Sequence, residues 1–224
     1  MDINSVPLGH PFRLIEHQRS QRPMLPTRQD VAIVLCGGGP DPFAEHDRAV
    51  ALCAEAGKPY ELLVGNDMIA EFPGPVHHAV TLHADKLSAC FTGPRRSKGY
   101  PLPDKVWSHR PYTGVSDWTR DWSGSTGLFG VKIFRELGFV HIILCGVPMT
   151  VDGGHFLRKQ PWHDATNFTK GWEMRWAQLK PYVRSFSGWT LQNLGEPTVK
   201  WLKTEIEDKH RQPAPPTSGQ GLKA

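Results

Sequence analysis

The chain has 224 residues, of which 39% are apolar and 21% are charged, so its composition is that of a globular protein with one sizeable core. The formal net charge of +4 is too small to indicate a general nucleic-acid-binding protein. Four scattered cysteines exclude a disulfide framework and fit a reducing compartment. No apolar run reaches the roughly 18 residues of a membrane span, and the N-terminus lacks the apolar core of a signal peptide. We therefore expect a cytoplasmic protein without a membrane segment.

Composition divides the chain into three segments. Residues 1–29 contain prolines and no sustained periodicity, which predicts an extended arm that packs on the domain or on a second copy in a homo-oligomer. Residues 211–224 are rich in Pro, Gly and Ser and predict a disordered tail. The remaining residues, 30–210, are expected to form one folded domain.

Strand and helix patterns alternate along this domain. Strands are expected at residues 30–36, 60–64, 78–82, 106–109, 140–144 and 183–186. Helices are expected at residues 41–57, 84–90, 125–137 and 198–210. This alternation predicts an α/β fold: a single Rossmann-like domain with a mostly parallel sheet and helices on both faces.

Individual residues refine the element boundaries. Asp41 is a predicted N-cap, and Gly57 is a predicted C-terminal stop for the first helix. Trp172 and Trp176 are four residues apart, which predicts that they share one core-facing side of a helix. All eight tryptophans lie after residue 106, so the second half of the chain is expected to supply the bulky walls.

Three consecutive glycines join the first strand to the first helix. Gly37, Gly38 and Gly39 permit a tight turn and let a ligand come close to the backbone. The N–H groups and dipole of the following helix favour a phosphate or a carboxylate. The pattern is neither G-x-G-x-x-G nor a P-loop. We predict nucleotide or anion binding here; the alternative is a purely structural turn.

A second turn of small residues precedes the helix expected at 125–137. Ser125, Thr126 and Gly127 would offer hydroxyl and backbone donors together, whereas capping alone needs one hydroxyl. Asn66 and Asp67 end the second strand and are expected to contact the same nucleotide, or else to form a polar turn. Open α/β sheets bind ligands at the carboxyl ends of their strands, so both turns are predicted to line one site.

Further polar residues are expected around an anionic small-molecule substrate. His83 and Asp85 follow the third strand, and Arg95 and Arg96 lie in a basic stretch that suits such a ligand. The alternative is that these residues are only solvated surface. No clustered metal-ligand motif is present, so no protein-bound metal is predicted, although Mg²⁺ accompanying a nucleotide phosphate stays open.

The segment 147–167 is long and lacks a regular pattern, as binding walls and lids often do. It contains His155 and His163, and a histidine can act as a general base at neutral pH. His155 follows two glycines and is the first candidate; His163 precedes Asp164 and is the second. The alternative for each is a histidine held by hydrogen bonds within a folded loop.

The motifs VLCGGGPD, VGND and GSTGLFGVKIFRELGFVHIILCGVPM resemble a known group of nucleotide-binding domains. The group comprises the bacterial CMP-sialic-acid sialyltransferases, the motility accessory factors and the pterin-pyrophosphokinase-like proteins, and the resemblance runs from Val31 to His163. In that group the nucleotide is held by positions that match Gly37, Gly39, Pro40, Asn66, Ser125, Thr126 and Gly127, with Gly146 at the end of the next strand. The chain departs from the sialyltransferases at Gly38, where they have Asn, and at Asp41, where they have Ser. Their catalytic histidine lies beyond the strand that ends in that Gly, as His155 and His163 do here.

The leading hypothesis is a glycosyltransferase-like enzyme that takes a nucleotide-sugar donor and uses a loop histidine as general base. One rival is an Mg²⁺-dependent nucleotidyl or pyrophosphoryl transferase. Another is a catalytically inert nucleotide- or glycan-binding module. Nucleic-acid modification is the least favoured alternative, because the sequence has basic stretches and tryptophans but no recognisable RNA- or DNA-binding motif.

Overall fold

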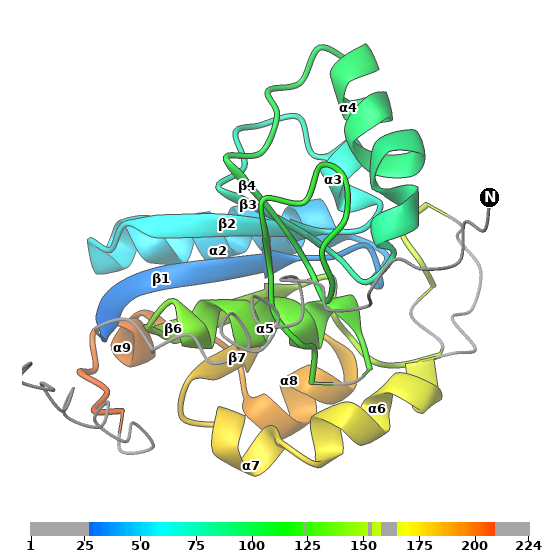
Figure 1. Cartoon of the computed structure of the whole chain (residues 1–224). Coiled ribbons are helices and arrows are strands. Elements are labelled where there is room, and N and C mark those ends of the chain that lie inside the picture. Colours follow the sequence, from blue (N-terminus) through cyan, green and yellow to red (C-terminus); the bar gives the residue numbers. More distant parts are fainter. Residues whose placement is uncertain (1–26, 123, 152–153, 158–164, 209–224) are drawn as a thin grey trace, which may run out of the picture.

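The structure, a computed structural model, describes residues 27–122, 124–151, 154–157 and 165–208. Within these residues lies a seven-stranded sheet in the order β5-β4-β3-β2-β1-β6-β7, and each pair of neighbouring strands is parallel (Figure 1). The strands are β1 (Arg28–Leu35), β2 (Tyr60–Gly65), β3 (His78–Thr81), β4 (Lys105–Ser108), β5 (Asp117–Trp118), β6 (Phe139–Cys145) and β7 (Val183–Ser185).

Helices cover both faces of this sheet. The α-helices are α2 (Pro42–Ala56), α3 (Met68–Glu71), α4 (Gly93–Ser97), α5 (Thr126–Glu136), α6 (Ala165–Glu173), α7 (Trp176–Leu179), α8 (Gly188–Leu194) and α9 (Val199–Leu202). A 3₁₀ turn, η1 (Ala84–Lys86), and a π-helical segment, η2 (Leu87–Thr92), precede α4. The predicted α/β Rossmann-like fold is confirmed.

The side chains of β1 and β6 are mostly apolar on both faces of the sheet, because each face packs on a separate core. Ala32 and Val34 of β1 pack with α5, whereas Ile33 and Leu35 pack with α2. All these side chains are fully buried. A continuous apolar run is what a parallel strand with two covered faces requires, which is why β1 and β6 are the most easily predicted strands.

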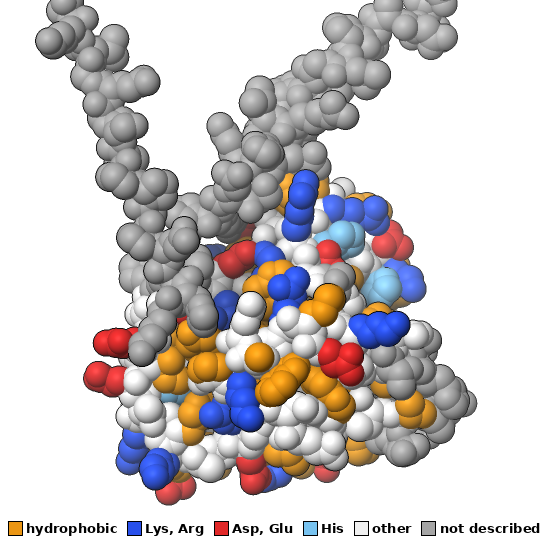
Figure 2. Space-filling model, turned by 90° about the horizontal axis from the view of Figure 1, so that it is seen from below, with side chains coloured by type: hydrophobic (Ala, Val, Ile, Leu, Met, Phe, Trp, Pro, Cys, Tyr) orange, Lys and Arg blue, Asp and Glu red, His pale blue; other side chains and the backbone are white. Residues whose placement is uncertain are grey.

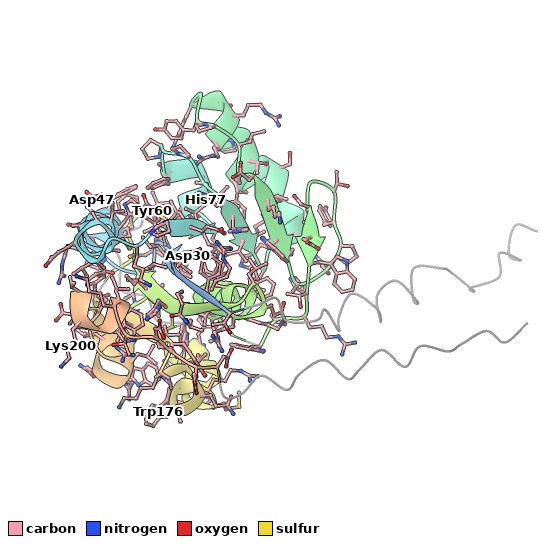
Figure 3. The ribbon with its side chains drawn as sticks, turned by 90° about the vertical axis from the view of Figure 1, so that its left-hand side faces the viewer. Asp30, Asp47, Tyr60, His77, Trp176 and Lys200 are labelled. Carbon is pink, nitrogen blue, oxygen red and sulfur yellow. The ribbon has the colours of Figure 1, made fainter. Side chains whose placement is uncertain are left out.

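The order of the strands reverses at β1. The chain runs outward from β1 through β2, β3, β4 and β5, and then returns through α5 to place β6 on the other side of β1. Open parallel sheets bind ligands beside such a reversal, outside the carboxyl ends of the strands. We call the edge at which the strands end the C-terminal edge; Figure 3 views the opposite edge, where Asp30, Tyr60 and His77 lie at or next to the starts of β1, β2 and β3.

The first helix is bounded as predicted. The Asp41 carboxylate accepts a hydrogen bond from Ala44 N at 3.1 Å, and Gly57 ends α2 with a φ of +67°. β1 begins at Arg28, so the last two residues of the expected arm belong to the sheet. The remainder of the predicted arm, and the predicted tail, lie outside the described residues.

Two predictions about helices are wrong. The terminal helix expected at 198–210 ends at Leu202, and the chain then continues to Asp208, whose carboxylate pairs with Arg135 at 2.5 Å and accepts from Tyr182 Oη at 3.0 Å. Trp172 and Trp176 belong to different helices, since α6 ends between them; Trp172 is fully buried and Trp176 only partly.

Candidate functional site

The first glycine turn brings the ends of β1 and β6 together. Gly38 N donates to Gly146 O at 2.9 Å, and a Cβ on Gly39 would lie 3.3 Å from Gly146 Cα. Gly146 has a φ of +66°, and a Cβ there would lie 1.9 Å from Cys36 O. The glycines therefore serve a close approach of two protein loops, and the Gly38 amide, expected to face a phosphate, is bound within the protein.

The N-terminus of α2 already holds two carboxylates. Asp41 is its N-cap, and Glu45 lies in its first turn. Glu45 Oε2 accepts from Gly146 N at 2.7 Å, and burial raises the pKa of this carboxyl above its usual value. These acids occupy the positive end of the helix dipole, where an anionic ligand would otherwise be stabilised.

The N-terminus of α5 is capped without any charge. Ser125 Oγ accepts from Leu128 N at 3.2 Å and from the buried Trp172 indole N–H at 3.0 Å, and the first turn of α5 contains no acid. Thr126 and Gly127 are the first residues of α5, so their backbone N–H groups have no acceptor within the helix. This end of the helix keeps the positive potential that favours a phosphate.

Asn66 connects this helix end to two strands. Its Nδ2 donates to Thr126 Oγ1 at 3.0 Å, and its Oδ1 accepts from Thr81 Oγ1 at 3.0 Å. Thr81 Oγ1 in turn accepts from His83 N at 2.9 Å. Asn66 has a φ of +49°, a conformation that Asn adopts more readily than most residues. A polar ladder thus runs along the C-terminal edge from α5 across β2 to β3.

The two predicted turns meet at the end of β2. A Cβ on Gly65 would lie 2.8 Å from Cys36 Sγ, which precedes the first turn, and 3.1 Å from Thr126 Cγ2 in the second. A side chain at position 65 would therefore collide with Cys36 and crowd Thr126, which explains why this residue is a glycine. Burial raises the pKa of the Cys36 thiol to about 12, which makes a reactive thiolate there unfavourable.

The His155 side chain lies against Gly37 of the first turn. A Cβ on Gly37 would touch the imidazole at 3.4 Å, and His155 Nε2 lies 3.6 Å from Asp67 Oδ2. His155 Nδ1 accepts from Leu157 N at 3.3 Å. The side chains of His155 and Asp67 are 18% and 33% exposed, so solvent and ligands reach the pair. His163 and Asp164 lie outside the described residues.

Arg95 is a correction to the predicted substrate contacts. It is fully buried, and its guanidinium donates to four backbone carbonyls, which lie in α3, in the loop after α3 and in the loop after α4. These acceptors are Ile69 O at 3.0 Å, Phe72 O at 2.6 Å, Gly74 O at 2.7 Å and Pro101 O at 2.5 Å. Arg95 therefore organises the chain around α3 and α4, whereas Arg96 is exposed.

His83 and Asp85 lie further along the C-terminal edge. Both are exposed, and Asp85 Oδ1 lies 3.5 Å from an Arg110 nitrogen. His83 is linked to Thr126 at the start of α5 through Thr81 and Asn66. In the described part of the chain, no group of three or more His, Cys, Asp and Glu side chains is placed to hold a metal ion.

Two basic residues near α7, Arg175 and Lys180, pack on tryptophan rings. Arg175 lies 4.8 Å from the Trp122 ring, and Lys180 lies 5.6 Å from the Trp176 ring. Figure 2 shows basic and apolar side chains interspersed on the face that carries α7 and α8. We therefore do not assign these two cations to the ligand.

A partly buried group of linked polar side chains, which sequence reasoning missed, lies near the starts of β1, β2 and β3. Glu61 Oε1 accepts from Arg28 at 2.7 Å, Glu61 Oε2 pairs with His78 Nε2 at 2.9 Å, and the Trp107 indole donates to His78 Nδ1 at 3.1 Å. Burial lowers the pKa of His78, so the neutral ring that fits both hydrogen bonds is favoured. Each of these four side chains has a hydrogen-bond partner within the group, so we assign the group a structural role.

Comparisons with known proteins were made at three levels. No family model matches the chain, and no curated protein matches it significantly. Among solved structures, it is similar to the monofunctional alpha-2,3-sialyltransferase Cst-I from Campylobacter jejuni, with a TM-score of 0.46 and 10% sequence identity over 84% of this chain and 87% of that one. Similarity of this degree does not decide what the chain binds or catalyses. No helix in the described residues combines the length and apolarity needed to cross a bilayer.

Proposed function

We propose that the chain is a glycosyltransferase-like enzyme that takes a nucleotide-sugar donor and uses His155 as general base. The observation that carries this proposal is the His155–Asp67 pair, whose nearest atoms are 3.6 Å apart beside Gly37 at the C-terminal edge. A partly exposed histidine next to a carboxylate, at the same edge of the sheet as the uncharged N-terminus of α5, is an arrangement that suits base-assisted group transfer.

The donor phosphate is assigned to the N-terminus of α5. The amides of Thr126 and Gly127 and the dipole of α5 would stabilise the phosphate oxygens as charge builds up on the departing nucleotide. Asn66 holds Thr126 in place, and Asp67 follows Asn66 directly, so the residue that supports the phosphate site and the carboxylate partner of the base are neighbours in the sequence.

The hydrogen bonds of His155 indicate how the ring would take a proton. Since Nδ1 accepts from Leu157 N at 3.3 Å, the neutral ring carries its proton on Nε2, toward Asp67. An acceptor hydroxyl that replaces Leu157 N as the partner of Nδ1 would give its proton to Nδ1. The Asp67 carboxylate would then stabilise the imidazolium, as carboxylates do in other histidine-dependent transferases and hydrolases.

The proposed transfer is a single displacement. The acceptor oxygen loses its proton to His155 and forms a bond to the anomeric carbon of the donor sugar. The bond from that carbon to the phosphate oxygen breaks, and the nucleotide leaves with the electron pair. No covalent enzyme intermediate is needed, so the reaction requires a base and a stabilised leaving group and no nucleophilic side chain.

The first experiment finds the nucleotide. Thermal unfolding is followed with a panel of nucleoside mono- and diphosphates and nucleotide sugars, CMP and CMP-N-acetylneuraminic acid included, each with and without Mg²⁺. Binding at a hundredfold excess over Kd stabilises the fold by about 2.7 kcal/mol. A donor that is turned over with release of pyrophosphate only when Mg²⁺ is present would instead favour the nucleotidyl-transferase rival.

The second experiment tests the base. His155→Ala is expected to lower turnover by about 10²- to 10⁴-fold and to leave donor affinity nearly unchanged. Asp67→Asn should also slow turnover, because the imidazolium loses its carboxylate. His109→Ala, at the end of β4 on the same edge, is the matched control and should be unaffected. Normal transfer by His155→Ala would refute the assignment.

A further inference from the structure

Three phenylalanine rings form a cluster next to the His155–Asp67 pair. Phe43 comes from the first turn of α2, Phe72 follows α3, and Phe156 is the neighbour of His155. Phe43 and Phe156 meet edge to face with centroids 5.2 Å apart, and Phe43 and Phe72 stack at 6.3 Å with ring planes 19° apart. All three rings are only partly buried, and they border the core on the α2 side of the sheet.

The same segment is fastened to the glycine turn by its backbone. Phe156 N donates to Gly37 O at 3.0 Å, and the imidazole of His155 lies over Gly37 Cα, where a side chain would touch it. The backbone bond fixes where the segment crosses the turn. The contact of the Phe156 ring with Phe43 holds the Phe156 side chain in place, which restrains the backbone that carries the neighbouring His155.

We infer that Phe43 is a positioning residue for His155, acting through the Phe156 ring to hold the imidazole between Gly37 and Asp67. This rests on the proposed role of His155 as base. Without the Phe43 ring, the segment would lose one of the contacts that hold it, while the Gly37 bond and the 3.6 Å contact to Asp67 would remain. An edge-to-face aromatic pair contributes enough for its loss to raise local opening about tenfold.

The test compares Phe43→Leu with Phe43→Tyr in the full chain. Leu keeps an apolar side chain in the core but removes the ring edge, whereas Tyr keeps the ring. The readouts are amide hydrogen exchange of Phe156, the NMR titration of the His155 ring, and kcat and KM for the donor identified in the thermal panel. Phe134→Leu is the matched control, because Phe134 and Phe139 form an edge-to-face pair at 4.9 Å in the core on the other face of the sheet.

Phe43→Leu is expected to speed exchange of the Phe156 amide about tenfold relative to core amides, to alter the His155 titration, and to lower kcat with KM little changed. Phe43→Tyr should restore all three. Phe134→Leu should lower global stability without a selective effect on Phe156. An unchanged Phe156 exchange rate and His155 titration in Phe43→Leu, or a rise no larger than in Phe134→Leu, would overturn the inference. Full turnover by His155→Ala would refute the proposed base. The exchange rate of Phe156 and the titration of His155 would then still decide whether Phe43 positions His155.

Discussion

The two turns of small residues at the C-terminal edge precede helices in the same way but differ in charge. The turn before α2 is followed by Asp41 as N-cap and Glu45 in the first turn, and Glu45 binds the Gly146 amide at 2.7 Å. The turn before α5 has the neutral Ser125 as N-cap and no acid in its first turn. Glycines before a helix therefore do not by themselves indicate an anion site, because the helix dipole can already be neutralised by the protein's own carboxylates.

Glycine allows a close contact between two parts of the protein in each turn. Around β1, it allows the loops of β1 and β6 to touch, as the Gly38–Gly146 bond and the Gly146–Cys36 approach show. At α5, a Cβ on Gly127 would lie 2.9 Å from Val147 Cγ1, so its glycine lets the helix end pack on the loop after β6. We therefore regard the first turn as mainly structural, and the second remains the proposed site for the ligand.

The largest effect is expected from Gly146→Ala, which tests whether the first turn is structural. Its Cβ would lie 1.9 Å from Cys36 O at a φ of +66°, so we expect a loss of at least about 3 kcal/mol or no folded protein. Gly57→Ala has nearly the same φ, +67°, and nothing within 4 Å of its Cβ. That control should lose only about 1–2 kcal/mol in urea unfolding. Equal losses would mean that the approach of the two loops does not need glycine.

Ser125→Ala should have an intermediate effect, because the hydroxyl caps α5 and also accepts from the buried Trp172 indole. We expect a loss of about 2 kcal/mol in the free energy of unfolding. Thr198→Ala removes the exposed cap of α9, which binds only Trp201 N at 3.1 Å, and should lose about 1 kcal/mol or less. If the two losses were the same, the indole bond would contribute nothing to stability.

Glu45→Gln should have the smallest effect, since Gln keeps an oxygen for the Gly146 amide. Burial raises the pKa of Glu45 in the folded state, so folding favours its protonated form and the charged form costs stability once the pH rises through that pKa. We expect Gln to be slightly more stable than Glu at pH 7, by about 1 kcal/mol at most, with the difference vanishing below pH 4.5. A Gln variant that loses stability at pH 7 would show that the charge itself holds the two loops.

The sequence predicts the parts of this fold that local patterns determine. The apolar runs of β1 and β6 and the Asp41 cap are confirmed because burial on both faces and capping leave direct marks in the sequence. The break between α6 and α7 leaves no such mark, since it depends on how Trp172 packs into the core. The two-residue strand β5 is too short to show any periodicity.

The candidate site could be predicted only as a set of residues. The sequence indicates Asn66, Thr126 and His155, and the structure brings them to one edge. The sequence could not show that Arg95 donates its hydrogen bonds to four backbone carbonyls, because a backbone acceptor leaves no mark in the sequence. Nor could it show that Glu45 reaches the loop after β6, which is what separates the two turns.

The assignment of the donor phosphate to α5 is tested most directly by placing a carboxylate there. Thr126→Asp and Thr126→Asn have nearly the same shape and both offer an oxygen to Asn66 Nδ2, so they differ mainly in charge. The affinity for the nucleotide that gives the largest thermal shift is then measured by calorimetry. Thr126→Asn should bind it about as tightly as the wild type. Thr126→Asp should bind it at least about tenfold more weakly, because the carboxylate would repel the phosphate. Asp41→Asn should change the affinity by no more than about threefold, because its effect on the α5 end is screened. The opposite result, a large gain in affinity for Asp41→Asn and none lost for Thr126→Asp, would place the phosphate at α2 and contradict the assignment.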